Sequence, residues 1–255
     1  MGHVTENNKQ HFTFEVCANS VESCVAAQNG GADRVELCSA LEVDGLTPSY
    51  ATIKEARKIL NIKLHVLMRP RSGNFCYSKN EIEIMAEDIK TAVSLGADGV
   101  VFGCLTHDGD IDIEAVKYLI SVAHESKNVS ITFHRAFDVC RNPQEALSQL
   151  MDLKINRLLT SGQQQTAEIG IPLLADLQSI VSSRKAVGHE QNKSVGIKIM
   201  AGCGVNENNI AKIYRQTQIA DYHFSAKIKK LSGLGEYYVT SEEKVKETIN
   251  ALREV

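Results

Sequence analysis

Short runs of hydrophobic residues alternate along the chain with longer segments whose apolar positions recur at helical spacing. The short runs are typical of buried strands, and the longer segments of amphipathic helices. The expected strands are 11–17, 33–38, 63–69, 98–103, 129–135, 156–161, 195–202 and 221–226. The expected helices begin near Val21, Pro48, Lys79, Ile113, Pro143, Thr166, Asn206 and Ser241.

Regular alternation of strands and helices predicts a parallel sheet with crossover helices. Eight such units favour a single α/β domain over 1–255, a closed (β/α)8 TIM barrel, and 255 residues suit that fold. Residues 1–10 are expected to form a flexible N-terminal tail. The alternative is a doubly wound open sheet, which usually carries a glycine-rich phosphate loop after its first strand. The segment CANSVES, which follows the first expected strand, contains no glycine.

Side chains of a strand alternate between its two faces, so each expected strand divides into two sets. The more apolar set, such as Phe14 and Val16, should face the helices, and the other set should line the barrel. Burying unpaired charge is costly, so Glu15 and Glu36 need partners such as Arg34, Arg69 or Lys198. A self-neutralising ionic core without a ligand stays open as an interpretation. The inward-facing residues are expected to include Glu15, Cys17, Arg34, Glu36, Cys38, His65, Arg69, Thr132, His134, Lys198, Gly202, His223 and Ser225.

The first two strands end alike, in Glu-Val-Cys at 15–17 and in Glu-Leu-Cys at 36–38. Neighbouring strands of a barrel would place both thiols side by side at its mouth. Soft thiolates suit Cu(I), which two ligands can satisfy. The alternative is that Cys17 and Cys38 are small buried residues, the usual state of free cysteine.

Two arginines stand at the end of the third expected strand. Arg69 should point inward, and Arg71 lies in the following loop. Guanidinium groups at a barrel mouth can bind carboxylate or phosphate through paired hydrogen bonds. The alternative for Arg69 is a structural salt bridge to Glu15 and Glu36.

The fifth expected strand ends in the segment TFHRAFD, 132–138. His134 should face the interior, where it could act as an acid, a base or a metal ligand. Asp138 lies just beyond and could orient the imidazole. The alternative is a hydrogen-bonded core histidine without a role in chemistry.

Small residues end the last three strands, as TSG at 160–162, AGCG at 201–204 and SA at 225–226. Such residues expose backbone N–H groups, and the loops after strands seven and eight are the usual phosphate site of these barrels. The alternative is that glycine serves a steric purpose there. The residues expected to bind an anion are Arg71, Arg135, Ser161, Gly162, Gly202, Gly204 and Ser225.

Composition narrows the function classes. A formal net charge of −3 favours neither nucleic acid nor an anionic membrane as partner. No apolar run approaches the roughly 18 residues of a membrane span, and the polar N-terminus lacks the apolar core of a secretory signal. The 7 cysteines are scattered, without a CxxC motif, which favours reduced thiols in the cytoplasm. The oligomeric state, including a homo-oligomer, stays open.

The chain contains, in this order and within about 12–226, the motifs EVCANSVESCVAAQNGGADRVELCSAL, GLTPS, MRPRSGNFCYS, DGVVFGCLTHDGDID, TFHRAFDVCRNPQEAL, RLLTSG and MAGCGVNENNI. Together these motifs resemble the copper homeostasis protein CutC family. The resemblance implies a TIM barrel, a cytoplasmic setting and a link to copper tolerance, with no reaction assigned. It implies Cu(I) ligands at Cys17 and Cys38. The implied mouth cluster is Glu15, Glu36, Arg69, Arg71, His134, Arg135 and Asp138.

The chain departs from the family pattern at two places. Asn74 stands where the family has an aspartate, and the loop after the eighth strand is shortened to 227–239.

Two functions follow from these residues, and both can hold. The first is a copper homeostasis protein that binds Cu(I) through the two cysteines. The second is an enzyme acting on a small phosphorylated or carboxylated metabolite. In it, Arg69 and Arg71 would grip the anion, and His134 and Glu36 would move protons.

Overall fold

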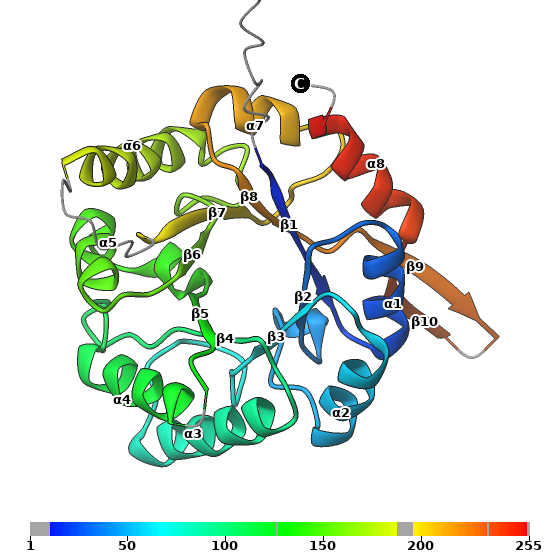
Figure 1. Ribbon diagram of the computed structural model, residues 1–255, viewed down its shortest axis with the longest axis horizontal. Helices are drawn as coiled ribbons and strands as arrows, with labels where there is room; N and C mark the ends of the chain where they lie inside the picture. The colour runs from blue at the N-terminus through cyan, green and yellow to red at the C-terminus, as the bar shows by residue number, and fades with distance from the viewer. Residues whose placement is uncertain (1–10, 126, 188–195, 234, 254–255) are drawn as a thin grey trace, which may run out of the picture.

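Eight parallel strands close into a barrel that a ring of helices surrounds, in a computed structural model that describes residues 11–125, 127–187, 196–233 and 235–253 (Figure 1). The TIM-barrel prediction is therefore confirmed. The expected N-terminal tail, 1–10, and Val195 lie outside the described residues. The barrel strands are β1 (Thr13–Ala18), β2 (Arg34–Leu37), β3 (Lys63–Leu67), β4 (Gly99–Phe102), β5 (Ser130–Phe133), β6 (Arg157–Thr160), β7 (Lys198–Gly202) and β8 (Asp221–Phe224). The α-helices are α1 (Val21–Asn29), α2 (Tyr50–Ile59), α3 (Lys79–Ser94), α4 (Ile113–His124), α5 (Pro143–Asp152), α6 (Ile171–Val187), α7 (Ile210–Thr217) and α8 (Glu242–Arg253).

Serine caps begin several of the described helices, among them α1, α2, α3 and α8, where the Ser241 hydroxyl accepts from the Lys244 N–H at 3.3 Å. The hydroxyl groups of Ser20, Ser49 and Ser78 each accept a hydrogen bond from the backbone N–H three residues later, which satisfies a donor that the helix leaves free. At α3 the Glu81 carboxylate also accepts from the Ser78 N–H at 2.7 Å, which completes a capping box. These caps fix the starts of α1, α2 and α3 by contacts that are local in sequence.

Two helices begin later than expected. Helix α6 begins at Ile171 instead of near Thr166, because Pro172 lacks a backbone N–H and is tolerated only in the first turn. Helix α7 begins at Ile210 instead of near Asn206. Asn206 accepts a hydrogen bond from the Asn208 N–H at 2.9 Å, so the asparagine side chains form a turn in place of a helical start.

The segment after β8 is a hairpin, although the sequence analysis treated it as a shortened loop. Strands β9 (Lys227–Ser232) and β10 (Gly235–Thr240) pair antiparallel and project from the ring beside α1 (Figure 1). The Ser23 hydroxyl of α1 accepts a hydrogen bond from the Thr240 N–H at 3.1 Å. Two β-prone runs around a glycine-containing turn are the sequence signal that this interpretation missed.

The hydrophobic core lies between the barrel and the helices. Phe14, Val35, Leu64 and Tyr222 belong to it, as the alternation of side chains along the strands requires. A second, small apolar cluster lies inside the barrel, formed by Cys17, Cys38, Leu67 and Val101. The interior also contains buried charged groups, including Glu15, Arg34 and Glu36, which lie together beneath the mouth.

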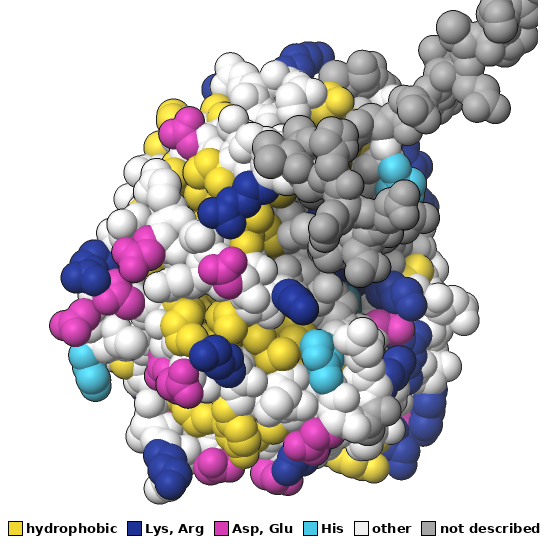
Figure 2. All heavy atoms as spheres, turned by 60° about the vertical axis from the view of Figure 1, so that its left-hand side comes forward, with side chains coloured by type: hydrophobic (Ala, Val, Ile, Leu, Met, Phe, Trp, Pro, Cys, Tyr) yellow, Lys and Arg dark blue, Asp and Glu magenta, His cyan; other side chains and the backbone are white. Residues whose placement is uncertain are grey.

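The outer surface carries both signs of charge. On the face shown in Figure 2, basic and acidic side chains are interspersed with hydrophobic ones, in keeping with the formal net charge of −3. Among the described helices, none is long and apolar enough to cross a membrane.

Candidate functional site

A cavity of about 590 Å³ opens at the carboxyl ends of the strands. This volume lies in the range of small-molecule sites, roughly 300–1,000 Å³. The cavity brings together many residues singled out in the sequence but not all of them. Those in its wall are Cys17, Glu36, Arg69, His134, Arg135, Asp138, Gly204 and Ser225. Those elsewhere are Glu15, Cys38, Arg71, Ser161, Gly162 and Gly202.

Glu15 lies beneath the cavity at the centre of an ionic cluster. Its carboxylate is fully buried and pairs with the Arg34 guanidinium. Glu15 Oε1 lies 2.8 Å from His223 Nδ1, and Glu15 Oε2, the oxygen that pairs with Arg34, lies 3.6 Å from His65 Nδ1. Burial opposes the charged form, but Arg34 and His223 hold the pKa of Glu15 well below its usual range. The expected partner Arg34 is therefore present, whereas Lys198 pairs with Asp221 at 3.5 Å.

His223 links this cluster to the cavity. Its Nε2 lies 3.6 Å from a carboxylate oxygen of Glu36, while its Nδ1 faces Glu15. Burial disfavours the imidazolium, yet Glu36 and Glu15 raise the pKa of His223 well above its ordinary value. Burial raises the pKa of Glu36 against the opposing charge of His223. The alternation of side chains predicted that His223 faces inward, but its spacing in the sequence pointed to no function.

The two expected copper ligands are adjacent. Cys17 and Cys38 have their Sγ atoms 3.6 Å apart, and Cys38 lies behind Cys17 with its thiol 3.6 Å from the Ala18 carbonyl. The hydrogen bond with Cys38 and burial together raise the pKa of Cys17 well above its ordinary value. Cys17 also joins Glu36 and His223 in a group whose candidate ligand atoms all lie within 4.8 Å of one another.

Arg69 is held by backbone carbonyls. Its Nη1 donates to Val43 at 2.9 Å and to Gly45 at 3.0 Å, and its Nη2 donates to Gly73 at 3.0 Å. The guanidinium also lies over the Phe75 ring, 5.1 Å from its centroid. Among the described contacts it makes no ion pair with either buried glutamate, so the counter-ion interpretation of this arginine is wrong. Its Nε is buried without a hydrogen-bond partner.

His134 is a fixed neutral imidazole. Its Nδ1 accepts a hydrogen bond from the Ala136 N–H at 3.1 Å, so the ring proton resides on Nε2. This Nε2 is buried and has no partner in the described structure. Burial and the nearby Arg69 lower the pKa of His134 to about 3. The ring is therefore oriented by the backbone, and the expectation that Asp138 orients it is wrong.

Arg71 lies outside the cavity wall. Its guanidinium pairs with Glu81 at the start of α3 and donates to the carbonyls of Asn74 at 2.9 Å and Cys76 at 2.8 Å. The loop therefore folds around this side chain, because its backbone carbonyls need donors. Sequence spacing carries no signal for such wrapping.

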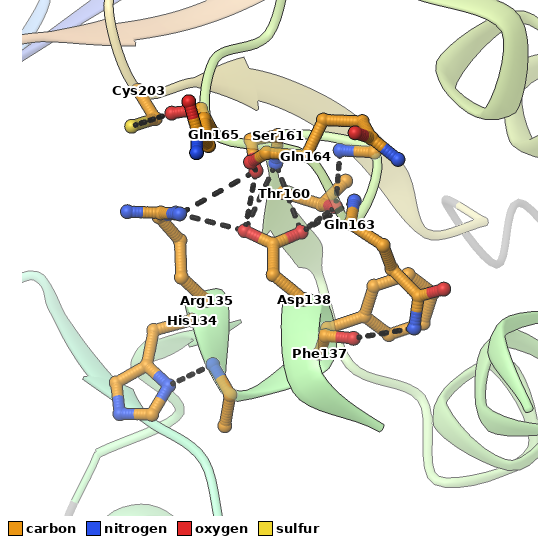
Figure 3. A network of polar contacts seen from close by, with 12 residues as sticks. His134, Arg135, Phe137, Asp138, Thr160, Ser161, Gln163, Gln164, Gln165 and Cys203 are labelled. Carbon is orange, nitrogen blue, oxygen red and sulfur yellow. Dashed lines mark hydrogen bonds and ion pairs between the residues drawn. The ribbon is translucent and has the colours of Figure 1, made fainter. Parts of the chain in front are cut away.

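Asp138 organises the loop after β6 (Figure 3). Its carboxylate accepts hydrogen bonds from the Ser161 N–H and hydroxyl, from the Gln163 N–H and from the Thr160 hydroxyl. It also pairs with Arg135 at 2.8 Å. These contacts occupy both carboxylate oxygens of Asp138. They also engage the N–H and hydroxyl groups of Ser161, a residue that was expected to bind an anion. Arg135 also lines the cavity.

At two of the expected anion-binding glycines, a Cβ would lie very close to neighbouring atoms. Gly162 has a φ of +69°, and a Cβ there would lie 2.4 Å from the Gly170 carbonyl oxygen. A Cβ at Gly202 would lie 2.4 Å from Leu159 Cδ1. The steric alternative therefore accounts for Gly162, which meets backbone atoms, whereas at Gly202 the contact is with the end of a flexible side chain. Gly204 and Ser225 face the cavity.

Fold and site define a (β/α)8-barrel protein with thiol, carboxylate and imidazole groups gathered at one mouth. The chain belongs to the CutC family, whose model matches residues 12–228. A CutC family protein of Bacteroides fragilis is 52% identical over 226 residues, covering 88% of this chain and 84% of the relative. One of Bacteroides thetaiotaomicron is 54% identical over 217 residues, covering 85% and 81%. The crystal structure of the proposed copper homeostasis protein CutC from Streptococcus agalactiae has a TM-score of 0.75 at 33% identity, over 84% of this chain and 98% of that one.

Proposed function

We propose that this chain is a cytoplasmic copper homeostasis protein that binds Cu(I) through Cys17 and Cys38. The observation that carries the proposal is the Sγ–Sγ separation of 3.6 Å between Cys17, which lines the cavity, and Cys38 behind it. A metal–thiolate bond of about 2.3 Å lets two sulfurs that share one ion lie up to about 4.6 Å apart. The separation is also far longer than a disulfide bond of about 2.05 Å, so both thiols are free ligands.

The surroundings of the thiols favour a soft monovalent ion. Leu67 and Val101 pack around the two cysteines in a small apolar cluster, and soft thiolates select Cu(I). Cys17 lines the cavity and gives the ion a path of entry, while Cys38 completes the pair behind it. All 7 cysteines are free, which supports a reducing compartment such as the cytoplasm. The proposed copper homeostasis role of the Streptococcus agalactiae relative points the same way.

The test is a Cu(I) titration under anaerobic, reducing conditions against a chromogenic chelator. Wild type should bind about one Cu(I) per chain, and the double variant Cys17→Ser/Cys38→Ser should lose that binding. Cys104→Ser is the matched control, because Cys104 is a buried thiol of the main core. A double variant that titrates like wild type would remove the site.

A second candidate function is catalysis on a small carboxylated or phosphorylated metabolite. The observation that favours it is a pair of buried donors without partners, Arg69 Nε and His134 Nε2, in the wall of one cavity. An unsatisfied buried donor costs about 1–3 kcal/mol, so an oxygen of a bound molecule would explain both. Because His134 is neutral, its role in this proposal is to donate a hydrogen bond, and Glu36 is the candidate proton acceptor.

A thermal-shift screen of small carboxylates and phosphates tests this second function. A binding metabolite should stabilise wild type by an amount that falls in the His134→Ala variant. Absence of stabilisation by every compound, or equal shifts in both proteins, would argue against a metabolite site at these donors.

A further inference from the structure

We propose that Cys17, Glu36 and His223 form a binding site for a divalent transition ion of the Zn²⁺ type, with an open coordination position facing the cavity. One candidate ligand atom from each residue lies within 4.8 Å of the others, and all three side chains are buried. The site shares Cys17 with the copper proposal but makes no use of Cys38.

The donor set is that of a borderline ion. A thiolate, an imidazole nitrogen and a carboxylate oxygen are the three ligand types that bind Zn²⁺, whereas Cu(I) prefers soft donors. His223 Nε2 and the Glu36 oxygen lie 3.6 Å apart. Bonds of about 2.0–2.2 Å allow two such atoms on one ion to be at most about 4.2 Å apart, so the observed spacing fits.

Glu15 prepares His223 for this role. The Glu15 carboxylate lies 2.8 Å from Nδ1 and accepts a hydrogen bond from the Nδ1–H group, which leaves Nε2 for the ion. Metal-bound histidines usually donate their second ring N–H to such a carboxylate, which fixes the ring and its tautomer. Arg34 in turn holds Glu15 by a buried ion pair. The carboxylate–histidine element is thus already assembled.

The scaffold of the site is rigid. Its ligands come from β1, β2 and the strand β8, which are hydrogen-bonded neighbours across the closure of the barrel. Ligand binding replaces two protons, the one on His223 Nε2 and the one on the Cys17 thiol, and both leave to solvent. No oxidant or reductant is needed.

The open position faces the cavity because all three ligands lie in its wall. Three protein ligands plus one exchangeable position are typical of catalytic zinc sites, while structural sites use four. Water, or a carboxylate or carbonyl oxygen of a small molecule, would take the fourth place from the cavity. The alternative is that His223 stays an imidazolium between Glu15 and Glu36, and that these three residues form an ionic cluster that binds no metal ion.

Titration of the full chain with Zn²⁺ and with Co²⁺ against a competing chelator separates these alternatives. Wild type should bind one ion per chain, and Glu36→Gln and His223→Gln should each weaken binding by at least about tenfold. Cys76→Ser is the control, because that half-buried thiol contacts the Thr106 carbonyl away from the cluster. No binding by wild type, or wild-type affinity in either ligand variant, would overturn the site.

The Co²⁺ complex identifies the sulfur. A sulfur-to-cobalt charge-transfer band should appear in wild type and Cys38→Ala and disappear in Cys17→Ser. A band that depends on Cys38 instead would overturn the proposal. Circular dichroism establishes that each variant is folded, and Glu36→Gln, which keeps the shape of the side chain, decides alone if His223→Gln does not fold.

Cu(I) titration of the same variants distinguishes this site from the copper site. Cys38→Ala should lose Cu(I) and keep Zn²⁺, whereas His223→Gln should lose Zn²⁺ and keep Cu(I). If the proteins fail to bind Cu(I) but bind Zn²⁺ as expected, the copper proposal is wrong and the divalent site is supported. Loss of both ions in both variants would mean one shared site and would overturn the assignment of separate ligand sets.

Discussion

The ionic cluster beneath the cavity yields a stability prediction with a definite magnitude. Glu15 is fully buried and is the acceptor for the buried Arg34 guanidinium and for His223. Replacing it by glutamine keeps the size of the side chain but leaves Arg34 without its counter-charge and His223 with Glu36 as its remaining carboxylate. Breaking a buried pair in this way costs about 3–5 kcal/mol. For a chain of this size, about 2–4 °C of Tm are lost per kcal/mol, so Tm should fall by about 6–20 °C.

Urea unfolding at pH 7, followed by circular dichroism, measures the loss in the free energy of unfolding. Glu55→Gln is the matched control, because Glu55 pairs with Lys58 on the surface, where both side chains are more than half exposed (52% and 57%). That change should stay within about 0.5 kcal/mol of wild type. A Glu15 variant that loses no more stability than this control would refute the counter-charge argument.

A double-mutant cycle checks the mechanism. In wild type, Arg34 Nη2 lies 3.4 Å from the Met200 sulfur. Arg34→Met removes the cation and places a thioether beside Met200. Combined with Glu15→Gln, it should recover part of the lost stability, with a coupling of about 0.5–3 kcal/mol between the two sites. Strictly additive losses would show that the pair does not act as a unit.

Three further predictions concern the cavity and its loops. His134 has a folded pKa of about 3 against 6.5 for an ordinary histidine, so its contribution is present above pH 6.5 and lost as the pH falls towards 3. His134→Gln should therefore show a shallower loss of unfolding free energy between pH 7 and 4, and equal slopes would contradict this. Sulfate or phosphate should raise the Tm of wild type, and should raise that of Arg69→Ala by less. Arg71→Ala is the control and should keep the wild-type rise, because Arg71 lies outside the cavity. Equal anion-dependent rises in wild type and Arg69→Ala would make Arg69 purely structural. Asp138→Ala, which strips the Ser161 N–H and hydroxyl of their acceptor, should cost about 1–3 kcal/mol in urea unfolding, and a neutral result would refute its role in the loop.

The sequence by itself determined the barrel and the orientation of its strands. Alternation along each strand is a local property of extended backbone, so it placed Glu15, Glu36 and Cys17 on the inner face before any contact was known. The helix expected near Pro143 begins at that proline, because a proline lacks only a donor that the first helical turn leaves free anyway.

Only the tertiary structure decided which inner residues meet. His223 and Glu15 are 208 positions apart and come within 2.8 Å because the barrel closes between β8 and β1. The hydrogen-bond partners of the loop residues could not be predicted from the sequence either. Arg71 donates to the carbonyls of its own loop, and Asp138 accepts from the N–H groups after β6. A charged side chain binds whichever unsatisfied backbone groups the fold brings near, and these follow from the path of the whole chain rather than from neighbours in sequence.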